Sequence, residues 1–128
     1  MSYYFSKTLD RQFDDAIVYV TESLKKEGFG VLSTIDIHQK LKEKLGVDFQ
    51  KYTILGACNP PFAYKALQAE NKIGTMLPCN VIVQEIGEGK VEVAAVDPIE
   101  SMKAIENPAL GDVATQVQAL LKRVIDNL

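Results

Sequence analysis

The chain of 128 residues has an ordinary globular composition, 47% hydrophobic and 24% charged, so we expect a single folded domain over residues 1–128. A formal net charge of −3 with dispersed lysines argues against nucleic-acid binding, which needs a basic face. No apolar run approaches the roughly 20 residues that span a membrane, so we expect no membrane partner either.

The first part of the chain alternates predicted strands and helices. Residues 3–9 are rich in aromatic side chains and predict a strand, and the apolar spacing of residues 13–24 predicts an amphipathic helix. Gly28 ends this helix, because glycine adopts the left-handed conformation of a helix terminus at little cost. The β-branched stretch 29–35 predicts a second strand.

A second helix is predicted over residues 37–45. Asp36 and Gln39 form a capping-box pattern at its start. The chain's one histidine, His38, falls in the first turn of this helix, where we expect it to face solvent. The inner edge of the helix is predicted to comprise Ile37, Leu41 and Leu45.

The second half of the chain contains a central strand, another helix and a hairpin. Residues 52–58 are mostly apolar and predict a strand inside the sheet. Asn59 then caps a helix over residues 60–70. This helix begins with two prolines, which the first turn of a helix tolerates. Two strands, 79–86 and 90–96, flank a glycine-containing turn and predict a β-hairpin.

The last elements complete the order β-α-β-α-β-α-β-β-α. Asp97 and Pro98 cap a brief helical turn, and the spacing of residues 113–128 predicts a C-terminal amphipathic helix. A hairpin combined with crossovers favours an α+β two-layer sandwich, with a mixed sheet of about five strands and helices on one face. Because such a sheet leaves a face or an edge open, we expect the chain to form a homo-oligomer.

Two Cys-Asn pairs stand at the ends of predicted strands. Cys58 and Asn59 precede Pro60 at a strand-to-helix junction, where backbone N–H groups and the helix dipole stabilise a thiolate or a small anion. Cys79 and Asn80 begin the next strand, so the two pairs line one site if these strands are neighbours. The candidate ligand-binding residues, with two nearby tyrosines as walls, are Tyr52, Cys58, Asn59, Pro60, Tyr64, Cys79 and Asn80.

The same cysteines also have a structural interpretation. Free cysteine is among the most buried residue types, and asparagine is a common helix cap. The spacing is far from Cys-x-x-Cys, so no zinc knuckle or thioredoxin-type motif is supported. Cys58 and Cys79 are the candidate metal ligands, and a three-ligand zinc site would need His38 beside them. No pattern identifies a cofactor or a reaction, since Gly-x-Gly-x-x-Gly, P-loop and Gly-x-Ser-x-Gly motifs are absent.

The start of the chain and its cysteine content bear on localisation. The first five residues lack the basic start and apolar stretch of a signal peptide. Two cysteines without an export signal are typical of free thiols in a reducing compartment. We therefore expect a cytoplasmic protein.

Two motifs and the hairpin give the chain a resemblance to a known family. Gly-Ala-Cys-Asn-Pro at residues 56–60 and Leu-Pro-Cys-Asn-Val at residues 77–81, with residues 91–98, resemble the domain of unknown function 302 family over nearly the whole chain. The resemblance implies a small α+β protein that associates as a homodimer, and it implies no activity. The matching motif positions are Cys58, Asn59, Pro60, Leu77, Pro78, Cys79 and Asn80.

Three functions are compatible with these residues, and we rank them in this order. The first is a module that binds a small molecule or a metal near Cys58 and Cys79. The second is a thiol-dependent enzyme or redox sensor that uses one of these cysteines as a thiolate. The third is a scaffold or interaction protein in which both cysteines are structural.

Overall fold

The computed structural model describes residues 2–128, which form a five-stranded sheet with helices. The strands are β1 (Tyr4–Leu9), β2 (Gly30–Asp36), β3 (Tyr52–Cys58), β4 (Cys79–Gly87) and β5 (Lys90–Val96). The helices are α1 (Phe13–Lys26), α2 (Ile37–Leu45), α3 (Pro60–Ala69), the 3-10 helix η1 (Ile73–Met76), α4 (Pro98–Ser101) and α5 (Pro108–Asp126).

These elements lie close to the predicted ranges, and the largest difference is the start of α5. This helix begins at Pro108 instead of residue 113, because the Asn107 side chain accepts a hydrogen bond from the Ala109 N–H at 3.1 Å and so caps it. Within residues 2–128, no helix is long and apolar enough to cross a membrane.

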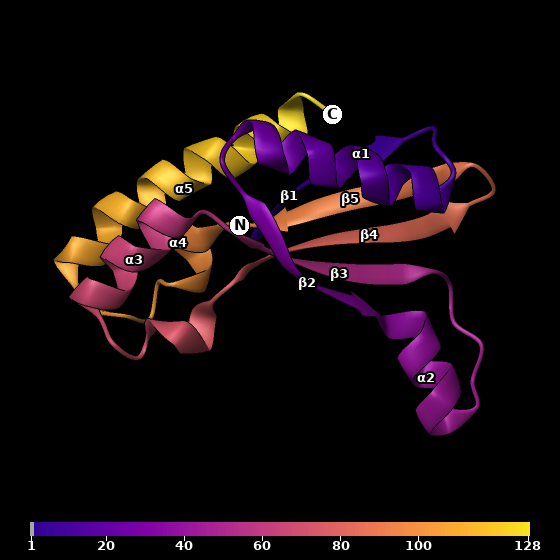
Figure 1. Ribbon diagram of the computed structural model, residues 1–128, viewed down its shortest axis with the longest axis horizontal. Coiled ribbons are helices and arrows are strands. Elements are labelled where there is room, and N and C mark those ends of the chain that lie inside the picture. Colours follow the sequence, from indigo (N-terminus) through magenta and orange to yellow (C-terminus); the bar gives the residue numbers. More distant parts are fainter. Residues whose placement is uncertain (1) are drawn as a thin grey trace.

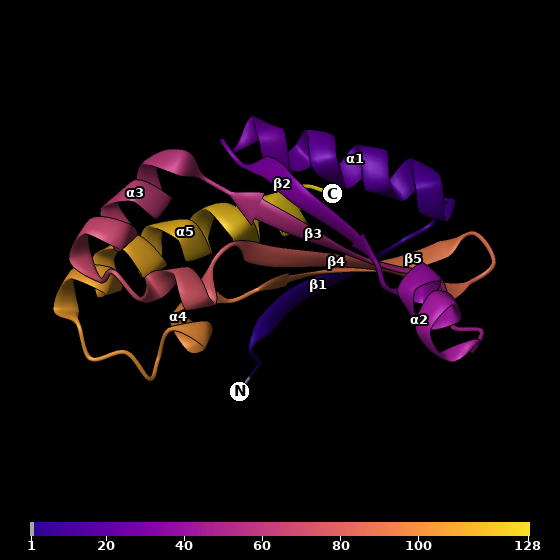
Figure 2. The ribbon, with the colours of Figure 1, turned by 60° about the horizontal axis from the view of Figure 1, so that its bottom comes forward.

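The sheet has the strand order β1-β5-β4-β3-β2, and every neighbouring pair is antiparallel. The predicted α+β class and the five strands are confirmed, but the predicted mixed sheet is wrong. The reason is visible in Figures 1 and 2, where α2 and α3 lie beyond opposite ends of the sheet. Because these helices do not run back along the strands, each returns the chain to an adjacent strand of opposite direction.

One face of the sheet carries the core. Figure 1 shows α1 and α5 side by side over this face, and both helices contact it. Alternate residues of β4 and β5 point toward them, and the valines at these positions are fully buried. The buried side of α1 recurs with helical spacing at Phe13, Ala16, Val20 and Leu24, as the sequence predicted. Helices on one face are therefore confirmed for this layer.

The opposite face, which we call the outer face, is covered by neither α1 nor α5. Ile54, Ile82 and Ala94 lie in register across β3, β4 and β5 on this face, and each is only half-buried. A sheet face exposed to water usually carries polar residues at such positions. This central row is therefore apolar, whereas Asn80, Gln84 and Glu92 beside it on the same face are polar.

Helix α2 differs from its prediction in what it buries. None of its residues is buried, and Leu45, which was predicted on its inner edge, is 69% exposed. The capping box is also absent, since the Asp36 carboxylate instead accepts a hydrogen bond from the Thr53 hydroxyl at 2.8 Å. The cause is the position of α2 beyond the strand ends, where no sheet face lies beneath it (Figure 2).

His38 attaches α2 to the sheet, and its predicted solvent-facing position is wrong. The ring is half-buried, and its Nδ1 atom accepts a hydrogen bond from the Tyr52 N–H at 3.0 Å. Its ring also meets that of Phe13 edge to face, with 5.9 Å between the ring centroids. The histidine therefore has a structural contact at the start of β3.

Gly56 allows the side chains of Ser33 and Pro78 to approach β3 closely on the outer face. A methyl group on this residue would lie 2.8 Å from Cγ of Pro78 and would also overlap the Ser33 hydroxyl. The serine can rotate away, but the proline ring is rigid, so an added side chain forces the backbone to move. β3, the start of β4 and the bulged part of β2 thus depend on glycine at this position.

We expect the Gly56→Ala substitution to lower the free energy of unfolding by about 1–3 kcal/mol, the usual cost of overpacking. Urea denaturation measures this change. Gly30→Ala is the matched control, because an added methyl group there meets no atom within 4 Å. Equal stabilities of the two variants would contradict this account of Gly56.

Candidate functional site

An apolar cavity of about 280 Å³ lies beside the two motifs at one end of the sheet. It lies where β3 ends and β4 begins, and α3, α4 and α5 gather around this end (Figure 1). We call it the junction cavity. Its wall includes Phe29, Cys58, Asn59, Phe62, Cys79 and Val117.

The register of β3 and β4 brings the two motifs to this cavity. Ala57 pairs with Cys79, so Cys58, the next residue of β3, lies diagonally across from Cys79 at the same sheet end. The chain leaves β3 through an extended Asn59, and Pro60 begins α3, because proline fits the first turn of a helix but not a central strand. Antiparallel pairing thus joins residues that are distant in sequence.

Three candidate residues of the sequence analysis line the junction cavity. These are Cys58, Asn59 and Cys79, and the motif residues Leu77 and Pro78 line it as well. One Cys-Asn pair therefore contributes both of its members, and the other contributes only its cysteine.

The remaining candidates lie elsewhere. Asn80 and Tyr52 line a groove of about 380 Å³ on the outer face, which we call the outer groove. Asn80 points there because it directly follows Cys79 in β4, and successive side chains of a strand point to opposite faces. Pro60 is exposed at the start of α3, and Tyr64, on the same helix, is 65% exposed, so neither lines the junction cavity.

Asn59 connects the start of α3 to the turn after α1. Its amide nitrogen Nδ2 donates a hydrogen bond to the Glu27 carbonyl at 3.3 Å, next to Gly28, which has the positive φ of 86° expected at a helix end. The side chain makes no capping hydrogen bond to α3, so its predicted role as a cap is wrong. Its carbonyl oxygen Oδ1 is the acceptor that remains for other partners.

The two thiols have different environments. Both cysteines are free; Cys58 is half-buried, whereas Cys79 is only 8% exposed. Burial raises the pKa of the Cys79 thiol from 9.0 to about 11, and the neighbouring Cys58 adds a smaller upward contribution. The Cys79 thiol is therefore neutral at physiological pH, which is unfavourable for a nucleophile or a metal ligand.

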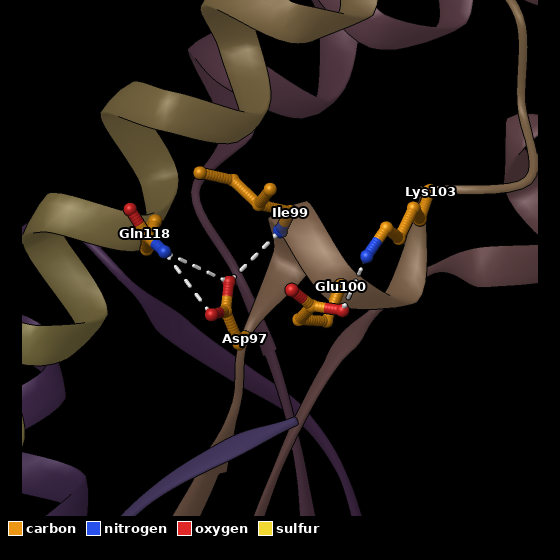
Figure 3. Close-up of polar contacts among 5 residues, drawn as sticks. All are labelled: Asp97, Ile99, Glu100, Lys103 and Gln118. Carbon is orange, nitrogen blue, oxygen red and sulfur yellow. Dashed lines mark hydrogen bonds and ion pairs between the residues drawn. The ribbon is translucent and has the colours of Figure 1, made fainter. Parts of the chain in front are cut away.

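A buried carboxylate positions the helices that close the cavity. Asp97 is 7% exposed, and its Oδ1 accepts hydrogen bonds from the Ile99 N–H at 3.0 Å and from the Gln118 amide at 3.1 Å (Figure 3). The predicted cap at Asp97 is thus confirmed, and Gln118 adds a link to α5. Glu100 and Lys103, also drawn in Figure 3, form only a peripheral ion pair of 3.6 Å. Asp97 therefore joins β5, α4 and α5.

Several cavity residues were not among the sequence candidates. Phe29 directly precedes β2 and Phe62 comes from α3, and Met102, Ala114 and Val117 come from the α4 and α5 region. Their sequence pattern is that of ordinary core residues, and nothing in it separates a cavity wall from a filled core. Only the packing of α5 across the end of the sheet identifies them.

The cysteines and His38 do not meet. His38 contacts Tyr52 at the start of β3, whereas Cys58 ends that strand, six residues or about 20 Å away. Among residues 2–128, no group of three or more His, Cys, Asp or Glu side chains is arranged to hold a metal ion. The three-residue zinc site considered from sequence is therefore not formed.

Comparison with known proteins agrees with this fold. The family described as "Domain of unknown function DUF302" matches residues 5–128. The chain is also similar to an uncharacterized conserved DUF302 protein from Bacillus stearothermophilus, known from its crystal structure. The two are 30% identical in sequence, the match covers 98% of each chain, and the TM-score is 0.89. No curated protein matches the chain.

The raised pKa of Cys79 predicts a specific loss of stability at alkaline pH. The thiol ionises near 9.0 in the unfolded chain and near 11 in the folded one, so the folded state holds the proton more tightly between these values. The stabilisation by the protonated Cys79 thiol is complete below about pH 9. We expect the free energy of unfolding to fall by about 2 kcal/mol as the pH rises through about 11.

Urea unfolding at about pH 8 and about pH 10.5 measures this loss. The Cys79→Ala variant should lack it, while Cys58→Ala should retain most of it. Lysine and tyrosine titration affects all three proteins alike, so the difference between them isolates the thiol. An equal pH dependence in Cys79→Ala and the original protein would show that Cys79 is not desolvated.

Proposed function

This chain belongs to the DUF302 family, as its motifs indicated, and we propose that it is a homodimeric module that binds a small molecule in the junction cavity. The observation that carries the proposal is the convergence of Cys58, Asn59 and Cys79, from two separate motifs, on one apolar hollow. Small-molecule sites are concave and mostly apolar, with a few polar groups that orient the ligand.

The other functions suggested by the sequence have less support. A thiol-dependent enzyme or sensor needs a thiolate, and burial keeps Cys79 in its neutral form. A metal at Cys58 and Cys79 would lack a third side-chain ligand among residues 2–128. A pure scaffold has no need of a hollow beside its two most distinctive motifs, whereas a binding module requires one.

The homodimer part of the proposal rests on the outer face. Its central row of Ile54, Ile82 and Ala94 is half-buried in a single chain, and a second copy would remove the row from water. Tyr4, at the edge of the same face, is 42% exposed. A cytoplasmic location belongs to the proposal as well, because both thiols are free and a reducing compartment keeps them so.

We expect native mass spectrometry of the gently purified protein to detect a bound small molecule. The Ala63→Leu variant should lose this added mass, because Ala63 lines the junction cavity from α3 and a larger side chain fills the space. Ala119→Leu is the matched control, since it adds the same atoms at an exposed position of α5 and should keep the mass. An added mass that persists in Ala63→Leu would place the ligand elsewhere.

We expect the Ile82→Lys substitution to convert the dimer to a monomer, because it places a charge at the centre of the outer face. Light scattering at micromolar concentration measures the molar mass. Val18→Lys is the control, because Val18 is a 61% exposed residue on α1, on the other side of the sheet. A monomeric original protein, or a dimeric Ile82→Lys variant, would contradict the proposed interface.

A further inference from the structure

The wall of the junction cavity contains no charged side chain among the described residues. Phenylalanine, leucine, alanine, valine, proline and methionine make up most of it. Its largest side chains are Phe29, Leu32, Phe62, Leu67, Leu77 and Met102. A charged group buried here would lose its hydration without gaining an ion pair, and that loss is costly.

The wall contains three polar side chains, namely two thiols and one amide. Cys58 and Cys79 contribute thiols, of which the second is held neutral by burial. Asn59 contributes an amide, and its Nδ2 is already bonded to the Glu27 carbonyl. The amide keeps a second Nδ2 proton and its carbonyl oxygen Oδ1, and Oδ1 is the one strong hydrogen-bond acceptor among the side chains of the wall.

The volume limits the size of the occupant. A cavity of about 280 Å³ equals the liquid volume of about nine water molecules. This volume is just below the range of about 300–1,000 Å³ that is usual for small-molecule sites. Two phenylalanine rings in the wall suit a flat ring system, which stacks against such rings or meets them edge to face.

We infer that the junction cavity takes an uncharged, mostly apolar molecule of one or two rings, with one hydrogen-bond donor directed at the Asn59 carbonyl oxygen. The inference rests on the proposed function, because it specifies the ligand class of that site. It excludes carboxylates, phosphates and ammonium compounds as the preferred occupants.

A rival arrangement involves a cation outside the wall. Lys65 lies on α3 with its Nζ atom 5.5 Å from the centre of the Phe62 ring, and it is exposed. A carboxylate at the mouth of the cavity would be attracted to this lysine while its rings enter the apolar space. An experiment on the ligand class must therefore compare a charged and an uncharged probe of the same shape.

Three naphthalene probes provide this comparison, namely 2-naphthol, 2-methoxynaphthalene and 2-naphthoate. The chain has no tryptophan, so naphthalene fluorescence reports binding with little interference. We expect 2-naphthol to bind most tightly, 2-methoxynaphthalene about fivefold more weakly for want of the donor, and 2-naphthoate at least about tenfold more weakly. The Ala63→Leu variant should weaken all binding, and Ala119→Leu should not.

Substitution of Asn59 isolates the hydrogen bond. In Asn59→Ala the advantage of 2-naphthol over 2-methoxynaphthalene should disappear, while both still bind. Because Asn59 also holds the turn at Glu27, circular dichroism and thermal unfolding must show that this variant is folded. If it is not, Asn59→Gln is the second variant. Its amide nitrogen keeps a donor for the Glu27 carbonyl, while its carbonyl oxygen is displaced by one methylene, so the preference for 2-naphthol should be reduced.

Two outcomes would overturn the inference. The first is binding of 2-naphthoate as tightly as 2-naphthol, with loss in Lys65→Gln, which would assign the site to anionic ligands and leave the proposed function intact. The second is an equal response of the original protein and Ala63→Leu to all three probes. The proposed function is judged separately, by the bound mass in native mass spectrometry.

Discussion

The antiparallel pairing of β3 with β4 is the constraint on which the rest of the structure depends. The pair of Ala57 and Cys79 sets where both strands meet α3 and η1, and hence where the junction cavity lies. A shift of one residue would turn Cys79 to the outer face and Asn80 toward the core, because neighbouring side chains of a strand alternate. The overpacking limit at Gly56 opposes displacement of β3 against β2 and Pro78.

The chemistry of the cavity follows from which elements surround it. A β-strand end and three helices supply mostly aliphatic and aromatic side chains. The buried carboxylate of Asp97, which precedes the wall residue Pro98, accepts hydrogen bonds from Gln118 and from a backbone N–H. The thiol of Cys79 stays protonated in this setting. The ligand that we propose would therefore be recognised by its shape and by one hydrogen bond.

Periodicity in the sequence was sufficient for the elements and for the α+β class, but not for the direction of the strands. The patterns of residues 13–24 and 79–96 are local, and both appear as a helix and a hairpin in the structure. Whether a helix returns along a strand or lies beyond its end depends on packing, so the mixed sheet was predicted wrongly. The position of Asn80 was predictable, since alternation alone separates it from Cys79. The cavity wall of α5 was not, because its residues resemble those of any core.

Helix α2 has a consequence for how the molecule opens. It buries none of its residues, and it lies at the end of the sheet opposite the helices around the junction cavity (Figures 1 and 2). Local unfolding costs least where little apolar surface is lost, and such segments behave as separate cooperative units. Its amide protons should therefore exchange with solvent through openings that leave β4, β5 and α5 folded. The fold divides into a peripheral unit of low local stability and a rigid one that contains the cavity.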